Sequence, residues 1–142
     1  MFFTGSYERT LDGKGRLVLP PKVRTKLPEG GFLVPLNDCL GLYPADAFKA
    51  LVDRMTDQVR NEDMPAKALL AFTSSAEEVE LDAQGRIGLT PRLRTKVGLD
   101  ANDVVVVGAS SHVQIWTAAR WNEQEDELTE SVAPILDRGL AF

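Results

Sequence analysis

The sequence predicts an α+β protein built from two copies of one unit. Three observations predict this class: a 17-residue segment occurs twice, short β-rich runs follow each copy, and each half ends in a stretch with helical periodicity. The repeated segments cover residues 11–27 and 81–97, match at a constant offset of 70 and share 9 of their 17 positions. Charged and turn-forming residues recur together with apolar ones, which chance does not produce over such a span. Whatever the unit does should therefore be done twice.

Each unit is expected to begin with a strand, a tight turn and a second strand. Residues 6–11 and 78–81 are short apolar–polar stretches typical of strands. Residues 12–15 and 82–85 have turn chemistry, and the last glycine of each turn is the position best suited to a positive φ. Residues 16–19 then predict a return strand, which would close a hairpin with the first strand.

The middle of each unit is expected to contain a helical turn and two more strands. The return strands end at proline, which also favours a helical turn after Pro20, Pro21 and Pro91. Two β-rich runs of strand length follow in each half, at 32–34, 40–43, 104–107 and 113–116.

Each half then ends in a helix, and the two helices differ in composition. The first carries one apolar stripe at spacings i, i+3, i+4, i+7 and i+11, formed by Phe48, Leu51, Val52, Met55 and Val59. The second is very acidic and carries a thinner stripe of Trp121, Leu128 and Val132. A further short helix is expected over residues 64–72. These elements divide the chain into a first unit with its helix (1–62), a linking helix (63–76) and a second unit with an acidic C-terminal helix (77–142).

Length and composition allow one compact domain or two small, closely packed halves. With 142 residues, 44% of them apolar, the chain can bury a core. Its single cysteine, Cys39, excludes an internal disulfide and fits a reducing cytoplasm. The longest apolar run, 104–107, is far too short to span a membrane, and the N-terminal residues lack the pattern of a secretion signal. We therefore expect a cytoplasmic protein without a membrane partner.

The net charge of −5 is unevenly distributed along the chain. Residues 9–26 carry +5 and residues 82–96 carry +3, whereas the remainder carries −13. The repeated segments are thus basic islands in an acidic protein. Because local charge decides where a polyanion binds, a nucleic-acid partner is compatible with the acidic total.

Both turns have the form Asp-x-x-x-Arg, from Asp12 to Arg16 and from Asp82 to Arg86. One interpretation is a structural ion pair, which is worth about 0–1 kcal/mol when exposed. The other is that each turn presents its arginine, with Lys14 beside the first, to phosphate or to base edges, which a planar guanidinium can bind through two donors. The two interpretations are compatible if each aspartate orients its arginine. The spacing alone favours neither, whereas the duplication and the surrounding basic residues favour nucleic-acid binding.

The other side chains that could bind a ligand or react are expected to have structural roles. The basic residues of the helical turns are expected on solvated faces, namely Lys22, Arg24, Lys26, Arg92, Arg94 and Lys96. His112 has no Cys, Asp or Glu at ligand spacing and is expected at the surface, whereas Cys39 is expected in the core. Four aromatic residues recur at an offset of 73 and are expected to anchor strand to helix: Tyr43, Phe48, Trp116 and Trp121. The sequence offers no positive sign of catalysis, of a metal site or of a cofactor.

Taken together, these residues resemble the MraZ family of bacterial regulators. The motif Leu-Asp-x-x-Gly-Arg occurs at 11–16 and again at 81–86, the chain opens with Met1-Phe2, and the aromatic pairs recur. The similarity covers nearly the whole chain, and the double motif at this spacing is specific. The resemblance implies two tandem AbrB-like β units that form an intramolecular pseudo-dimer, each followed by a helix. It further implies assembly into a ring, a cyclic homo-oligomer. It also implies sequence-specific binding to double-stranded DNA upstream of a cell-division and cell-wall gene cluster, with nucleoid association.

Matched by position, the family's DNA-facing motif falls on both turns. It covers Asp12, Lys14, Gly15 and Arg16 in the first turn, and Asp82, Gly85 and Arg86 in the second. The two aspartates are the expected orienting carboxylates, and Arg9, at the start of the first basic segment, is expected to join the DNA contacts. The second unit departs from the pattern at Gln84, Gly88 and Thr90. These departures imply that the second turn binds DNA more weakly or mainly supports assembly.

We therefore predict a DNA-binding transcriptional regulator that is not an enzyme and that binds repeated operator sites as an oligomer. The alternative is an AbrB-like protein-interaction module in which the arginines are structural. Retention on duplex DNA at low salt, lost as the salt concentration rises, distinguishes the two.

Overall fold

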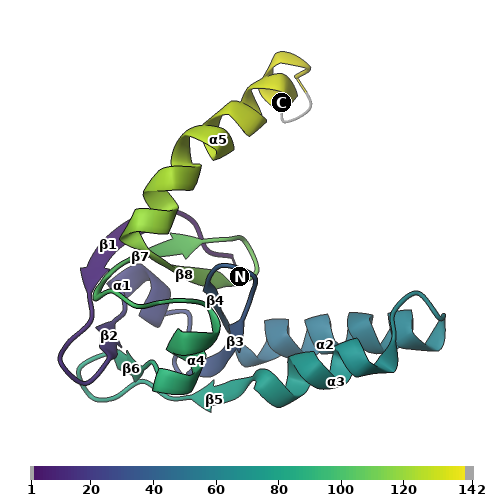
Figure 1. Ribbon diagram of the computed structural model, residues 1–142, viewed down its shortest axis with the longest axis horizontal. Helices are drawn as coiled ribbons and strands as arrows, with labels where there is room; N and C mark the ends of the chain where they lie inside the picture. Colours follow the sequence, from purple (N-terminus) through teal and green to yellow (C-terminus); the bar gives the residue numbers. More distant parts are fainter. Residues whose placement is uncertain (1, 140–142) are drawn as a thin grey trace.

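The computed structural model describes residues 2–139, which form a β-rich body with two projecting helical parts (Figure 1). Met1, part of the expected family signature, and residues 140–142, the end of the expected second unit, lie outside the described residues. The strands are β1 (Ser6–Thr10), β2 (Arg16–Val18), β3 (Gly31–Pro35), β4 (Leu40–Tyr43), β5 (Glu77–Val79), β6 (Arg86–Gly88), β7 (Asp103–Gly108) and β8 (Val113–Thr117). The helices are α1 (Pro21–Arg24), α2 (Ala45–Arg60), α3 (Ala66–Ser75), α4 (Pro91–Lys96) and α5 (Ala118–Asp137).

Six strands form one antiparallel sheet in the order β1-β7-β8-β4-β3-β5. The order is unchanged when each strand is replaced by its equivalent in the other half, β1 by β5, β7 by β3 and β8 by β4. At the centre of the sheet, Gly41 lies opposite Gln114, its equivalent at the offset of 73. An approximate twofold axis therefore relates the halves, as an intramolecular pseudo-dimer requires.

The remaining two strands, β2 and β6, pair with each other and join the repeated segments. Leu17 lies opposite Ile87, its equivalent at the offset of 70. The predicted hairpin within each unit is wrong, because β1 pairs with β7 and β5 pairs with β3, so neither pairs with the return strand of its own unit. Strand β7, which contains four consecutive valines, gives β1 five consecutive partners in the other half. Pairing between the halves thus replaces the local hairpins, and only their turns remain, between β1 and β2 and between β5 and β6.

The hydrophobic core is shared by the two halves. From β2, β6 and the residues just after them it takes a set of side chains exposed by 2% or less: Leu17, Leu19, Ile87 and Leu89. The proline-initiated helical turns contribute the buried side chains Val23, Leu27, Leu93 and Val97. Because the same cluster includes Leu33, Leu42, Val106 and Ile115 from the central sheet, both repeated segments are fixed to one rigid base.

Helices α2 and α3 lie side by side and project from one side of the body (Figure 1). Phe48, from the predicted apolar stripe, stacks on Phe32 of β3 with ring centroids 4.5 Å apart and on Phe72 of α3 at 6.0 Å. No side chain of α2 is fully buried, because its stripe meets only one other helix and the end of the sheet. The short helix expected over residues 64–72 is present as α3, and its C-terminal end leads directly into β5.

Helix α5 leaves the body in a different direction and extends well beyond it (Figure 1). Its first turn is attached: the Thr117 hydroxyl accepts the Arg120 N–H, and Trp116 and Trp121 are in contact with ring centroids 5.8 Å apart. Further along, the stripe is not covered, and Leu128 and Val132 are 46% and 44% exposed. Among the described residues, the longest and most apolar helices still fall short of what a bilayer crossing requires.

Candidate nucleic-acid interface

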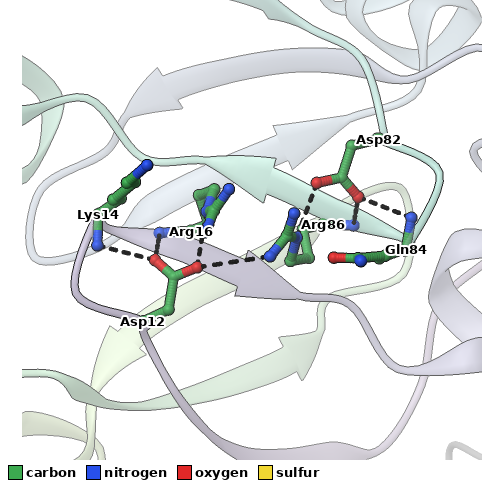
Figure 2. Close-up of polar contacts among 6 residues, drawn as sticks. All are labelled: Asp12, Lys14, Arg16, Asp82, Gln84 and Arg86. Carbon is green, nitrogen blue, oxygen red and sulfur yellow. Dashed lines mark hydrogen bonds and ion pairs between the residues drawn. The ribbon is translucent and has the colours of Figure 1, made fainter.

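The two Asp-x-x-x-Arg turns are closed by their aspartates in the same way (Figure 2). Asp12 Oδ1 accepts the backbone N–H groups of Lys14 and Arg16, each at 2.9 Å, and its Oδ2 accepts Arg16 Nε at 2.6 Å. Asp82 makes the equivalent bonds to Gln84 N, Arg86 N and Arg86 Nε at 2.9, 2.9 and 2.7 Å. Each aspartate therefore holds the backbone of its turn and the guanidinium of its arginine at once.

These hydrogen bonds lower the pKa values of both carboxyl groups. For Asp12 the backbone N–H of Arg16 is the largest cause, followed among the lowering contributions by the Arg16 side chain, and the pKa falls from 3.8 to about 2. The pKa of Asp82 is lowered by the same kinds of donor, with the backbone N–H of Arg86 first. Both carboxylates are thus negatively charged at neutral pH and can keep their arginines oriented.

The β2–β6 ladder brings the two turns to opposite ends of one short ribbon, with their arginines between them (Figure 2). Arg86 Nη1 lies 3.7 Å from Asp12 Oδ2, so Arg86 is close to the carboxylates of both turns. Arg16 forms an ion pair with Asp12 at 2.6 Å. The Arg16 side chain is 36% exposed, whereas that of Arg86 is 22% exposed. The first arginine is therefore more available to a ligand than the second.

The last glycine of each turn has the backbone conformation expected for it. Gly15 and Gly85 have φ values of +73° and +74°, a region that side chains rarely permit. Their N–H groups donate to Asp12 O and Asp82 O, each at 3.0 Å. Their carbonyls accept from the opposite half, Gly15 O from Leu89 N at 2.9 Å and Gly85 O from Leu19 N at 3.1 Å. Each turn is therefore completed by the other repeat.

Two arginines of the helical turns do not lie on solvated faces as predicted. Arg24 and Arg94 are half-buried, and each lies against the turn glycine of the other half. An ideal Cβ on Gly15 would be 3.1 Å from Arg94 Cζ, and one on Gly85 would be 2.9 Å from Arg24 Cδ. The sequence carries only a weak signal for this position. Arginine occurs at the same place in both repeats, but so does lysine at Lys26 and Lys96, which have no such contact with a turn glycine among the described residues. The expectation of a solvated face was wrong for these two arginines, because the position of a residue on a helix does not show which segment of the other half packs against it.

The other basic residues of the two basic segments differ in their surroundings. Lys14 is exposed in the first turn, as expected of a residue that could contact a ligand. Arg9 lies on β1 at the edge of the large sheet, where its Nη1 donates to Glu8 O at 2.8 Å. Arg92 forms an ion pair with Glu77 at 2.6 Å, and Lys26 donates to Phe2 O at 2.6 Å. The prediction of solvated faces holds for the exposed Lys22 and Lys96.

The remaining candidates have structural surroundings. His112 is half-buried and stacks on Tyr43 with ring centroids 4.4 Å apart, so the expected surface position is wrong. Its pKa is lowered by desolvation. Cys39 is buried, as predicted, and burial raises the pKa of its thiol to about 12, which keeps it protonated. The residues from 2 to 139 contain no cluster of three or more His, Cys, Asp or Glu side chains that could hold a metal ion.

Comparison with known proteins agrees with the duplicated architecture. The family model described as "MraZ protein, putative antitoxin-like" matches twice, over residues 2–70 and 72–141. The chain belongs to the MraZ family. This is a family of transcriptional regulators and not an enzyme family, and the two matches confirm the prediction of tandem units in an α+β protein.

Individual MraZ relatives are similar over nearly their whole length. The chain is 36% identical to the transcriptional regulator MraZ of Desulfitobacterium hafniense, over 97% of this chain and 99% of the relative. It is 36% identical to that of Symbiobacterium thermophilum over 94% and 97% of the two chains. It is 33% identical to that of Lactobacillus delbrueckii subsp. bulgaricus over 95% and 94%.

Proposed function

We propose that this protein is a transcriptional regulator that binds specific double-stranded DNA through its two Asp-x-x-x-Arg turns. The observation that carries the proposal is the pairing of β2 with β6, which places the repeated turns on one ribbon with Arg16 and Arg86 between them. A two-stranded ribbon fits the width of the major groove of B-DNA. Membership of a family whose relatives are named as transcriptional regulators supports the same conclusion.

The first turn makes the stronger contact in this proposal. Arg16 uses its Nε to bind Asp12, and the Nη groups of the same guanidinium can donate to guanine or to phosphate. Lys14 is exposed beside it and adds a second positive charge, whereas the second turn has Gln84 at this position. Arg86 is less exposed and is close to two carboxylates. Arg9 lies on β1 away from the ribbon, so its contribution is a longer-range attraction to phosphate.

The resemblance extends the proposal to the site of action. The operator lies upstream of a cell-division and cell-wall gene cluster, and the protein acts in the cytoplasm in association with the nucleoid. The basic character of the repeats in an otherwise acidic chain favours binding through one surface only, because acidic surfaces repel DNA.

Self-association is the second part of the proposal. Helix α5 exposes a line of apolar side chains along its outer turns: Leu128, Val132, Ile135 and Leu136, each between 43% and 46% exposed. Exposed apolar side chains in such a row favour contact with another protein surface. Because one ribbon makes few phosphate contacts, several copies in a closed ring would gain affinity by engaging repeated sites.

The alternative function is a protein-interaction module in which the arginines are structural. The contacts of Arg86 with both Asp12 and Asp82 favour this alternative for the second turn. It predicts that the arginines can be removed at a cost in stability alone, without loss of a nucleic-acid ligand.

Footprinting on the DNA upstream of the protein's own gene tests the proposal. We expect protection of a discrete site that weakens steeply as salt rises, because bound phosphates release their counterions. A scrambled duplex of the same length and composition serves as the control. Equal binding to both duplexes, or no binding at low salt, would contradict the proposal and favour the interaction module.

A further inference from the structure

Each candidate DNA-binding turn lies against an arginine that belongs to the other repeat. Arg94, on α4 of the second half, lies beside Gly15 of the first turn, with Cζ and Nη2 only 3.1 and 3.2 Å from the place of a Cβ. Arg24, at the end of α1 in the first half, occupies the corresponding place beside Gly85, with Cδ at 2.9 Å and Cζ at 3.3 Å. The approximate twofold relation between the halves therefore extends to these two side chains.

We propose that Arg24 and Arg94 are positioning residues, each of which holds the binding turn of the opposite repeat in its active conformation. The positioning of the turns does not require DNA, whereas its effect on DNA binding rests on the proposed function. In this arrangement neither repeat can form a complete turn alone, and the two turns act as one coupled unit.

The contacts of Gly15 explain how an arginine can position the turn. Gly15 has a φ of +73° and is flexible by nature, because a glycine without neighbours can adopt many other backbone conformations. Its carbonyl is held by Leu89 N, and Arg94 lies against its α-carbon. Both constraints come from the segment 89–94, so this segment fixes the last residue before Arg16.

The surroundings of Arg94 indicate that packing, and not pairing with an acid, keeps it in place. Its Nε is buried and has no hydrogen-bond partner among the described residues, which costs free energy. The flat guanidinium can lie against a glycine where a rounder ammonium group would leave space. Its permanent positive charge also lies next to the turn that carries Asp12, so it adds to the positive potential expected to attract phosphate.

The first experiment measures amide hydrogen exchange in the full-length protein without DNA. Arg94→Met keeps the apolar stem and removes the guanidinium, and Lys96→Met on the same helix removes an equal charge at an exposed position. In Arg94→Met we expect the N–H groups of the first turn (Lys14, Gly15 and Arg16) to exchange about tenfold faster, because the turn opens more often. The second turn and the Lys96→Met variant should stay within about twofold of wild type.

The reciprocal variant tests the crossing of the halves. Arg24→Met should accelerate exchange in the second turn (Gln84, Gly85 and Arg86) and leave the first turn unchanged, with Lys22→Met as the matched control. Acceleration in the variant's own half, or in neither turn, would overturn the proposal. Because no DNA is present, this result does not depend on whether the protein binds DNA.

A double-mutant cycle on operator affinity then tests the consequence for function. Arg94→Met and Arg16→Ala affect the same turn, so we expect their effects on the dissociation constant to be non-additive. Arg94→Met and Arg86→Ala affect different turns and should be closer to additive. If Arg94 instead bound a phosphate directly, Arg94→Met would lower the salt dependence by about one unit of slope and leave exchange of the first turn unchanged, which would overturn the positioning role.

Discussion

Asp12 and Asp82 have the same hydrogen bonds, but the arginines that they hold are engaged to different degrees. Arg16 has one carboxylate beside it, whereas Arg86 lies within 3.7 Å of one and 2.7 Å of another. A guanidinium that interacts with two carboxylates loses more favourable interaction energy when it turns towards a ligand. The difference between the repeats therefore lies in the partners of each arginine as well as in the exchange of Lys14 for Gln84.

Replacing Arg16 should weaken DNA binding without unfolding the protein. We expect Arg16→Ala to cost about 1–3 kcal/mol of specific binding free energy if the arginine contacts a base. Arg86→Ala should cost less, because that side chain is less exposed and has no lysine beside it. Fluorescence anisotropy with operator DNA measures both, and thermal melting shows that the variants are folded. Arg60→Ala, on the exposed end of α2, is the control. A folded Arg16→Ala protein that binds like wild type would exclude this role for Arg16.

The turn should remain closed well into the acid range. Asp12 has a pKa of about 2 in the folded protein against an ordinary value of 3.8, so its contribution to stability is fully present above pH 3.8. That contribution is lost as the pH falls through about 2, when the folded carboxylate takes up a proton. Carbon-detected NMR of the Asp12 carboxyl group should give a midpoint near 2. In Arg16→Ala the backbone donors remain, so the midpoint should rise only part of the way to 3.8. A wild-type midpoint at the ordinary value would contradict the hydrogen-bonding scheme.

At the scale of elements, each binding turn is completed by strands that come from both repeats. The turn between β1 and β2 is local, yet β1 pairs with β7 and β2 pairs with β6. Each turn is therefore fixed at both ends by the opposite half. A substitution that distorts one turn should therefore lower the stability of the protein as well as its affinity for DNA.

Two glycines of the first turn provide a matched test of this local structure. Gly15→Ala places a methyl group at φ +73°, 3.1 Å from both Leu89 O and Arg94 Cζ, and should cost at least ~1 kcal/mol of stability. Gly13→Ala meets nothing within 4 Å and copies Ala83 of the second turn, so its cost should stay within about 0.5 kcal/mol. Denaturant titration measures both. Equal stability of the two variants would show that Gly15 is not held as described.

At the scale of the whole molecule, the binding ribbon and the exposed apolar surface belong to different parts. The ribbon β2–β6 lies on the body, whereas the exposed stripe lies along α5, which projects from the body (Figure 1). This separation would allow copies to associate through α5 without covering their turns. The acidic side chains of α5 would also keep DNA away from that surface.

Assembly through α5 has a direct test. Leu128→Ser combined with Ile135→Ser removes apolar side chains that are 46% and 43% exposed, so each chain should fold normally. Light scattering should then show smaller assemblies than those of the wild-type protein. Glu130→Gln on the same exposed helix is the control. With the wild-type protein we expect a cyclic oligomer and an operator with short direct repeats about 10 bp apart. A monomer at micromolar concentration that binds one isolated repeat at full strength would rule out the ring.

Features with local signals could be predicted from the sequence. The apolar stripe of five residues that begins at Phe48 predicted α2, and the β-branched run at 104–107 predicted β7. The prolines predicted the short helices α1 and α4. The turn motif also predicted the positive φ of Gly15 and Gly85. The roles of the turn residues in DNA binding, and the unit boundaries at 62 and 76, remain predictions.

The amino-acid sequence alone was enough to predict a duplicated α+β protein of the MraZ family with two Asp-x-x-x-Arg turns. These features depend on residue type, on periods of two and 3.6 residues and on repetition, all of which are written along the chain. Three features are visible only in the folded molecule: β1 pairs with β7, Arg24 and Arg94 lie against the opposite turns, and α5 leaves its stripe uncovered. Each of these depends on contacts between segments about 60 residues or more apart, or on the lack of a covering segment. Such contacts are chosen by the free energy of the whole fold, because several local arrangements satisfy the same pattern equally well.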